Sequence, residues 1–513
     1  MDFKKNKVNG DDNEKLKPVR NYIWRPFVIF FLSTIFLIII QLLDFNPEIS
    51  GFRIKKINLF LDIVKKKEKK KITSLDNKHF NINESTNIAM AGRLKPEKSV
   101  ELSENFMSQN DSSVNKNEFC KTEDFNTDRI VDFSHKRNDM KRLAAKLKQV
   151  KMANKKVRIA YYGDSVIEGD ILVQDFRNYL QDNFGGRNVG FVPVTSVFSG
   201  FRQTIFHSYS PDWQTYSFLS NEKNVPLGIS GYTYIPKILN YDSALDENAI
   251  LKDIDNSSWT EYRAAKIYKT LQFFNSVSIY YSHVKTKSYA VFTIDDTKRI
   301  IRPLEIGEDL ETITITPDKV FRKVKINILS NAEMFIYGVN FDDKGGVYID
   351  NFSYRGISGI EIKKIDGGLI KKFNDILHYD LIILQYGSNI IDPVYKTYKW
   401  YQRQMVSAIK YINENIKTAA VLTISVHDIS IKNDNGEYDT NPRIPLLVKE
   451  QYNIANLSKS SFWNLYYVMG SEKSMVRYVE NKQANYDFTH FNMSGGRILA
   501  ELLYRAIINK KDN

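Results

Sequence analysis

Residues 157–165 read VRIAYYGDS, and this stretch determines how the chain is expected to fold. The apolar run 157–162 has the length of a buried strand, and it stops at a Gly-Asp-Ser turn. Residues 172–184 then carry a helix-compatible pattern that ends at two glycines. A strand, a turn and a helix in this order form the repeating unit of a parallel α/β sheet.

The same unit recurs further along the chain. Short apolar runs at 381–385 (LIILQ) and 421–426 (VLTISV) predict two more buried strands, and 397–413 between them has helical character. Apolar residues at helical spacing between Met140 and Val150 predict an amphipathic helix just before the first strand. Strands that alternate with helices in this way indicate an α/β domain.

Residues 232–349 have a different texture, with little helical pattern and several runs typical of strands. These runs are 277–281 (VSIYY), 289–294 (YAVFTI), 312–315 (TITI) and 324–328 (VKINI). We therefore expect an all-β sandwich at 232–349, inserted between two parts of the α/β domain at 135–231 and 350–510. A chain of 513 residues is long enough for two folded units.

The amino-terminal region is expected to anchor the protein in a membrane. Residues 24–43 (WRPFVIFFLSTIFLIIIQLL) are almost continuously apolar and have the length of a transmembrane helix, without a signal-peptide cleavage site. We expect the basic tail 1–23 on the cytoplasmic side and the folded part outside. Residues 44–134 are predicted to be a juxtamembrane and disordered linker, in which 52–64 is either a helix on the membrane surface or plain linker.

The formal net charge of +13 is concentrated in the first 160 residues, in lysine-rich runs such as 65–71. This distribution indicates a solvated tether near a bilayer, and no zinc-finger spacing or RNA-binding motif points to nucleic acid. The single cysteine, Cys120, excludes a disulfide within the chain. No His-Glu-x-x-His and no Gly-x-Ser-x-Gly motif is present, so zinc-protease and α/β-hydrolase interpretations lack their motifs. We expect neither a metal nor another cofactor.

Three residues have the chemistry of a nucleophilic triad. A serine hydroxyl becomes a nucleophile when a histidine takes its proton and a carboxylate orients that histidine. Ser165 ends the turn after the first strand, and Asp487 and His490 precede the last predicted helix. The turn presents the hydroxyl and leaves the Ser165 backbone N–H free to receive negative charge. By itself, however, a Gly163-Asp164-Ser165 turn is more often an ordinary helix cap.

Other candidate residues rank lower. His427 with Asp428 is either an alternative base or, as we favour, a loop or substrate-contact pair, because adjacent side chains point apart in an extended segment. His207, His283 and His378 are isolated and are expected to be structural or surface residues.

Aromatic pairs in the insertion allow two interpretations. Tyr280-Tyr281 and Phe273-Phe274 are suited to stacking on sugar rings, but we favour a place in the sandwich core.

Four short motifs carry a family resemblance. They are Gly163-Asp164-Ser165, Gly356-Ile357-Ser358-Gly359, Gly387-Ser388-Asn389 and Asp487 to His490. In this order and in these structural contexts, they resemble the conserved blocks of SGNH (GDSL-like) hydrolases over roughly residues 155–510. Gly-Ile-Ser-Gly also occurs at 228–231, and we prefer the second copy because it precedes the strand that leads to Asn389.

The resemblance implies a flavodoxin-like three-layer fold and ester hydrolysis through an acyl-enzyme. Ser165 would be the nucleophile, His490 the general base and acid, and Asp487 the residue that orients His490. The oxyanion hole would combine the backbone N–H groups of Ser165 and Gly359 with the side-chain amide of Asn389. Gly163 and Asp164 would form the supporting turn.

An SGNH domain with a β-sandwich between its first two blocks is similar to peptidoglycan O-acetylesterases, whose jelly-roll-like insert resembles a carbohydrate-binding module. This resemblance implies a membrane-anchored, extracytoplasmic esterase that removes O-acetyl groups from peptidoglycan or another polysaccharide. A polysaccharide O-acetyltransferase is the alternative enzyme, and a non-catalytic glycan-binding protein is the alternative from another class. The sequence does not define the oligomeric state.

Overall fold

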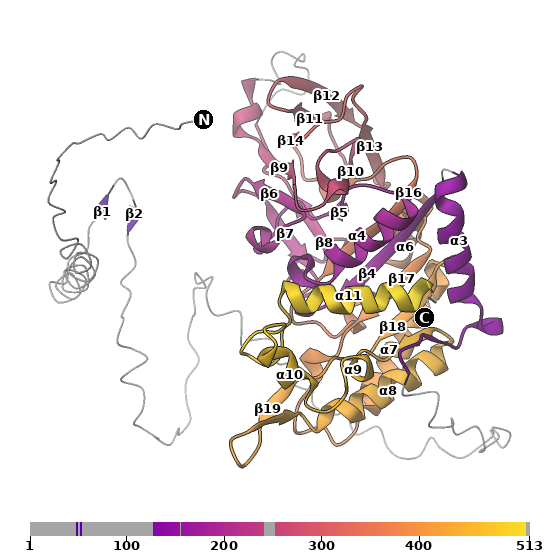
Figure 1. Ribbon diagram of the computed structural model, residues 1–513. Coiled ribbons are helices and arrows are strands. Elements are labelled where there is room, and N and C mark those ends of the chain that lie inside the picture. Colours follow the sequence, from indigo (N-terminus) through magenta and orange to yellow (C-terminus); the bar gives the residue numbers. More distant parts are fainter. Residues whose placement is uncertain (1–47, 50–51, 54–126, 154, 241–251, 509–513) are drawn as a thin grey trace, which may run out of the picture. The chain divides into compact units, whose positions relative to one another are not determined.

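The computed structural model describes residues 48–49, 52–53, 127–153, 155–240 and 252–508 (Figure 1). The chain divides into two units, 1–93 and 94–513. In the first, β1 (Glu48–Ile49) pairs antiparallel with β2 (Phe52–Arg53). The predicted tail at 1–23 and anchor at 24–43 lie outside the described residues. No helix among the described residues combines the length and apolarity that a membrane span requires.

A mostly parallel six-stranded sheet is the centre of the second unit. Its order is β16 (Gly346–Ser353), β4 (Lys156–Gly163), β17 (Leu381–Gln385), β18 (Ala420–Ile424), β21 (Ser461–Trp463) and β3 (Val131–Asp132). Only the edge strand β3 runs antiparallel to its neighbour. It lies within 44–134, which was predicted to be linker, so the predicted start of the folded part at 135 is too late; a strand of two residues leaves no pattern in the sequence. Counted along the chain from β4, the five parallel strands have the order 2-1-3-4-5, which is the flavodoxin-like order.

Helices cover both faces of this sheet (Figure 1). One face carries α3 (Asp139–Ala153), α4 (Val173–Phe184) and α11 (Met493–Ile508), and the other carries α6 (Gly367–Leu377), α7 (Lys399–Asn415) and α8 (Arg443–Ser458). Successive side chains of a strand point to opposite faces, so Ile159 and Tyr161 pack with the first group and Ala160 and Tyr162 with the second. The α/β architecture predicted from the sequence is confirmed.

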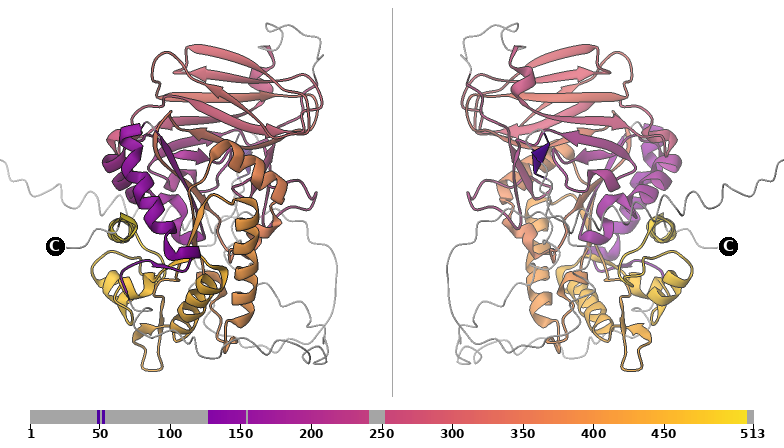
Figure 2. Two further views of the ribbon diagram at one scale, coloured as in Figure 1. Left: turned by 90° about the vertical axis from the view of Figure 1, so that its right-hand side faces the viewer. Right: turned by 90° about the vertical axis from the view of Figure 1, so that its left-hand side faces the viewer.

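The insertion consists of two antiparallel sheets, stacked in both views of Figure 2. One sheet contains β13 (Glu311–Ile315), β10 (Val277–Ser282), β15 (Phe335–Phe341), β8 (Tyr232–Ile235) and β7 (Gln214–Ser217), with β5 (Gly190–Val192) also paired to β15. The other contains β12 (Lys298–Leu304), β11 (Ser288–Ile294), β14 (Lys323–Leu329), β9 (Ser258–Ala264) and β6 (Ile205–Tyr209). Side chains of both sheets, such as Ile279 and Phe292, share one buried cluster. The predicted sandwich is present.

The sandwich begins earlier than the sequence predicted. Its strands β5, β6 and β7 lie at 190–217, ahead of the expected boundary at 232. These strands are only three to five residues long, so their alternation is too short to stand out from a loop. Residues 346–349, which were assigned to the insertion, belong instead to β16 of the parallel sheet. The first Gly-Ile-Ser-Gly copy, at 228–231, lies between β7 and β8, inside the insertion.

Buried groups join the insertion to the parallel sheet. Arg158 of β4 donates from Nε to Asp350 at 2.7 Å and from Nη1 to Asp342 at 2.9 Å, and its side chain is fully enclosed. Aromatic contacts also belong to this interface, because Tyr280 and Tyr337 of the sandwich pack against Phe373 of α6. This geometry holds the insertion firmly against the layer that carries the candidate site.

Candidate functional site

Ser165, His490 and Asp487 lie within hydrogen-bonding distance of one another, although 325 residues separate the serine from the histidine. The Ser165 Oγ lies 3.0 Å from His490 Nε2, and His490 Nδ1 lies 2.8 Å from Asp487 Oδ2. A carboxylate can only accept here, so Nδ1 carries the hydrogen and Nε2 is free to accept the serine proton. This is the arrangement in which a histidine acts as a general base toward a serine.

The turn that carries Asp487 and His490 is built around the aspartate. Its Oδ1 accepts the backbone N–H groups of Thr489 and His490, each at 3.0 Å. Partial burial raises the pKa of Asp487, but these hydrogen bonds and the one from the His490 ring outweigh burial and hold its pKa below the ordinary value. The carboxylate therefore stays ionised and can stabilise an imidazolium at His490.

Ser165 follows β4 at the carboxyl edge of the sheet, and Asp164 fixes the turn. The buried carboxylate of Asp164 accepts the Val166 N–H at 3.0 Å and the Ser388 hydroxyl at 2.6 Å. Burial raises the pKa of Asp164, while the hydrogen bonds from Ser388 and Val166 act in the opposite direction. Gly163 leaves no room for a side chain, since a Cβ there would lie 2.8 Å from Ile167.

Asn389 is next to this turn. Its amide Nδ2 donates to Asp164 Oδ2 at 3.3 Å and to the Ile357 carbonyl at 3.0 Å. These contacts join the 163–165, 356–359 and 387–389 motifs into one network at the switch point between β4 and β17, where flavodoxin-like sheets bind ligands. Both amide hydrogens of Asn389 already have protein acceptors. An oxyanion would therefore have to displace either Asp164 or the Ile357 carbonyl to receive a hydrogen bond from Asn389.

Gly359 adopts a backbone conformation that favours glycine, with φ of 92°. A Cβ there would lie 2.5 Å from the Tyr386 ring, in the segment that leads to Asn389. The second Gly-Ile-Ser-Gly copy, rather than the first, thus lies beside Asn389. In the first copy, the Ile229 carbonyl instead accepts the Tyr162 hydroxyl at 2.7 Å.

A Gly359→Ala substitution is expected to lower the free energy of unfolding by about 2–4 kcal/mol, because it adds strain at positive φ to a clash with Tyr386. Gly356→Ala is the matched control, since Gly356 also has a positive φ but a Cβ there would meet only Leu219 at 4.0 Å. The control should lose only about 1–2 kcal/mol. Urea unfolding of both variants measures the difference, and equal losses would show that the contact with Tyr386 is not limiting.

His427 packs against the turn that carries Asp487 and His490, and its position does not suit a second base. Its ring is buried, and its Nε2 lies 2.8 Å from the Thr489 carbonyl, so that Nε2 must donate. Burial is the main reason that its pKa falls to about 4. Asp428 points elsewhere and accepts the Met475 N–H at 2.8 Å, as expected for adjacent residues. His427 therefore supports the loop that carries His490.

Lowering the pH from 6.5 to 4 is expected to destabilise the fold. An unfolded histidine takes up a proton near its ordinary pKa of 6.5, whereas folded His427 resists until about pH 4, so the unfolded chain binds more protons in this window. For His427 alone, the free energy of unfolding is expected to fall by about 3 kcal/mol between pH 6.5 and pH 4. His207 is also buried, with a pKa of about 4.

Glutamine variants separate the two histidines. Both His427→Gln and His207→Gln should flatten the dependence of unfolding free energy on pH between 4 and 6.5. Only His427→Gln should also lower kcat, because only His427 supports the Thr489 carbonyl. Denaturation curves and initial rates for both proteins provide the comparison. An unchanged kcat in His427→Gln would remove this histidine from the support of the site.

The three isolated histidines and three of the four aromatic residues follow the favoured predictions. Phe273 does not, because it is only half-buried and the Arg322 guanidinium lies 4.5 Å from the centre of its ring. His207 bonds to the Val194 carbonyl, His283 to Ser282, and His378 ends α6 at the surface. Phe274, Tyr280 and Tyr281 are buried in the sandwich, which excludes them from sugar stacking. No group of three or more His, Cys, Asp or Glu side chains suited to a metal occurs among residues that the structure describes.

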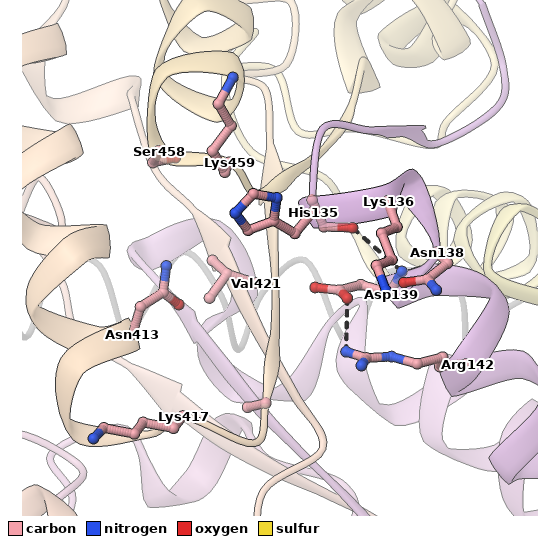
Figure 3. Close-up of a pocket in the computed structure, with 12 residues that line it drawn as sticks. His135, Lys136, Asn138, Asp139, Arg142, Asn413, Lys417, Val421, Ser458 and Lys459 are labelled. Carbon is pink, nitrogen blue, oxygen red and sulfur yellow. Dashed lines mark hydrogen bonds and ion pairs between the residues drawn. The ribbon is translucent and has the colours of Figure 1, made fainter.

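A cavity of about 490 Å³ lies away from this network (Figure 3). Its lining includes His135, Lys136, Lys417 and Val421, at the amino edge of the parallel sheet and opposite to Ser165. None of the predicted site residues contributes to it. The chemistry of the triad, not the size of this cavity, identifies the candidate site.

Glu168 and Arg355, beside the network, were not predicted from the sequence. The Arg355 guanidinium donates to Glu168 Oε2, with Nε at 3.1 Å. Burial raises the pKa of Glu168, whereas Arg355 lowers it. The pair is separated by 187 residues. The sequence pointed to these two residues only through their positions, because Glu168 is three residues after Ser165 and Arg355 directly precedes Gly356.

Comparison with solved structures identifies the fold. A structure described as a peptidoglycan O-acetylesterase in action superposes with a TM-score of 0.56 at 16% identity, and the match covers 74% of this chain and 99% of that one. The chain has the SGNH hydrolase fold.

Other solved structures match this SGNH-fold chain less completely. A structure described as a "putative GDSL-like lipase" from Parabacteroides merdae matches at 15% identity with a TM-score of 0.25, and the match covers 32% of this chain and 74% of that one. A family two carbohydrate esterase from Cellvibrio japonicus matches at 9% identity with a TM-score of 0.24, and the match covers 60% of this chain and 98% of that one. No family model and no curated protein matches the sequence.

Proposed function

We propose that this protein is a serine esterase that removes O-acetyl groups from an extracytoplasmic polysaccharide, with peptidoglycan as the favoured substrate. The observation that carries the proposal is the hydrogen-bonded chain from Ser165 Oγ through His490 to Asp487, at 3.0 and 2.8 Å. The superposition with a structure described as a peptidoglycan O-acetylesterase, over 99% of that chain, supports the choice of substrate.

In the proposed reaction, the Ser165 Oγ attacks the acetyl carbonyl carbon while its proton passes to His490 Nε2. The carbonyl oxygen becomes an oxyanion, which the N–H groups of Ser165 and Gly359 and the Asn389 amide would stabilise. His490 then donates the proton to the sugar oxygen, and the carbon–oxygen bond of the ester breaks. The products of this half are a free sugar hydroxyl and acetyl-Ser165.

Water completes the cycle. His490 removes a proton from a water molecule, the resulting hydroxide attacks acetyl-Ser165, and acetate leaves as the Ser165 hydroxyl is restored. The side chains of His490 and Asp487 keep 37% and 48% of their surface exposed. Because solvent reaches the base so readily, this geometry favours water over a second sugar as the acceptor of the acetyl group. It therefore favours an esterase over an O-acetyltransferase.

Anchoring at a membrane is part of the proposal. It rests on the apolar run 24–43, whose length matches a bilayer core, and on the extracytoplasmic location of the favoured substrate. The expected linker between residue 44 and the edge strand β3 would separate the folded part from the membrane and let the site reach a wall polymer.

Acetate release tests the proposed activity. The wild-type protein is incubated with O-acetylated peptidoglycan, acetylated xylan and a small aryl acetate, and free acetate is measured over time. We expect release from all three, fastest per ester from peptidoglycan. Faster release from xylan would keep the esterase but replace its substrate, and no release from any of them would contradict the proposed function.

A further inference from the structure

The 3-10 helix η4 (Ser199–Phe201) brings part of the insertion to the edge of the candidate site. Phe201 is 69% exposed, yet its Cβ lies 3.4 Å from the position that a Cβ of Gly169 would take. Gly169 is four residues after Ser165. An exposed aromatic side chain of the segment between β5 and β6 therefore stands beside the 3-10 helix η3 (Ser165–Asp170) that begins at Ser165.

Charged groups complete this surface. The Arg355 guanidinium lies 4.3 Å from the centre of the Phe198 ring and is bonded to Glu168, three residues after Ser165. Arg355 directly precedes the Gly356–Gly359 motif, and its side chain is 53% exposed. We call Phe198, Phe201, Arg355 and Glu168 the η4 ledge.

The chemistry of the η4 ledge suits a sugar better than a fatty acyl chain. Exposed aromatic rings pack against the C–H faces of pyranose rings, and guanidinium and carboxylate groups bond to sugar hydroxyls and amides. A fatty acyl chain needs a continuous apolar surface, whereas the ion pair between Arg355 and Glu168 interrupts the apolar surface of the η4 ledge. Stacking between Arg355 and Phe198, together with the bond to Glu168, also holds the guanidinium in place before substrate arrives.

We propose that the η4 ledge is a sugar-binding subsite that makes the protein select esters carried on a polysaccharide over small soluble esters. The inference rests on the proposed esterase function and deepens it. Binding energy from sugar rings away from the reacting ester would then be used to place the acetyl group at Ser165. The insertion would contribute to specificity through η4 and not through its buried aromatic residues.

Phe201→Ala is the test. The ratio kcat/KM is measured for acetylated polysaccharide and for an aryl acetate, which is too small to reach both the ledge and Ser165. We expect about a tenfold fall for the polysaccharide and a change of less than about twofold for the aryl acetate. Phe201→Tyr keeps a ring and should retain the wild-type preference. Leu457→Ala is the control, because Leu457 is 55% exposed at the far end of α8 and should affect neither substrate.

The outcomes separate this inference from the proposed function. Equal losses for both substrates would show that Phe201 only supports the Ser165 turn, and an unchanged polysaccharide rate would show that the ledge binds no sugar; either result overturns the inference. If wild-type protein cleaves neither substrate, the proposed function fails first. Circular dichroism and thermal unfolding of Phe201→Ala confirm that a loss is not due to misfolding.

Discussion

Ser165→Ala is expected to lower kcat for an aryl acetate by at least about a thousandfold, because no other group in the triad can form the acyl-enzyme. The hydroxyl removed lies 3.0 Å from His490 Nε2, and its loss leaves the buried Asp164 network in place. KM should change little, since the missing interaction acts only during the chemical step.

Ser208→Ala is the matched control for this substitution. Ser208 lies on β6 of the insertion and its side chain is exposed, so its loss should leave both kcat and KM unchanged. Thermal unfolding of both proteins shows whether each remains folded. A Ser165→Ala protein that keeps more than about a tenth of wild-type activity would exclude Ser165 as the nucleophile.

Asp487→Asn is expected to lower kcat by about 10³–10⁴-fold at neutral pH. The substitution retains the size of the side chain but removes the charge that receives the His490 Nδ1 hydrogen and stabilises the imidazolium. An amide there can also donate to Nδ1 and so favour the tautomer whose Nε2 carries the hydrogen, which cannot accept a proton from Ser165.

The control for Asp487→Asn is Asp439→Asn. Asp439 lies on β20 (Tyr438–Thr440), and its carboxylate forms a long ion pair of 3.5 Å with Lys473. The control variant should retain wild-type rates. A loss of less than about tenfold in Asp487→Asn would mean that another carboxylate orients His490. The pair of variants thus tests the assignment without a change of volume.

The regular elements could be predicted from the sequence because their patterns are long and uniform. The helix expected at 172–184 is α4 at Val173–Phe184, and the strand expected at 381–385 is β17. The start of the insertion could not be predicted because β5 has three residues and pairs with β15, about 150 positions later in the chain. Pairing over that separation leaves no local pattern.

The triad residues could be proposed from the sequence because each belongs to a short motif with its own chemistry. The groups that support them could not. His427 contacts the Thr489 carbonyl across 62 positions, and Arg355 contacts Glu168 across 187. These contacts depend on how the carboxyl ends of β4, β16 and β18 meet at one edge of the sheet. The spacing of residues along the chain does not encode such a contact.

The most direct test of the central claim is the mass of the protein after reaction with a fluorophosphonate, which forms a stable bond to an activated serine. The account predicts a single adduct, located by peptide mapping on Ser165, in the wild-type protein. It also predicts that Ser165→Ala gives none and that Asp487→Asn reacts much more slowly. An adduct on another serine, or no adduct in wild-type protein that is folded, would contradict a nucleophilic Ser165.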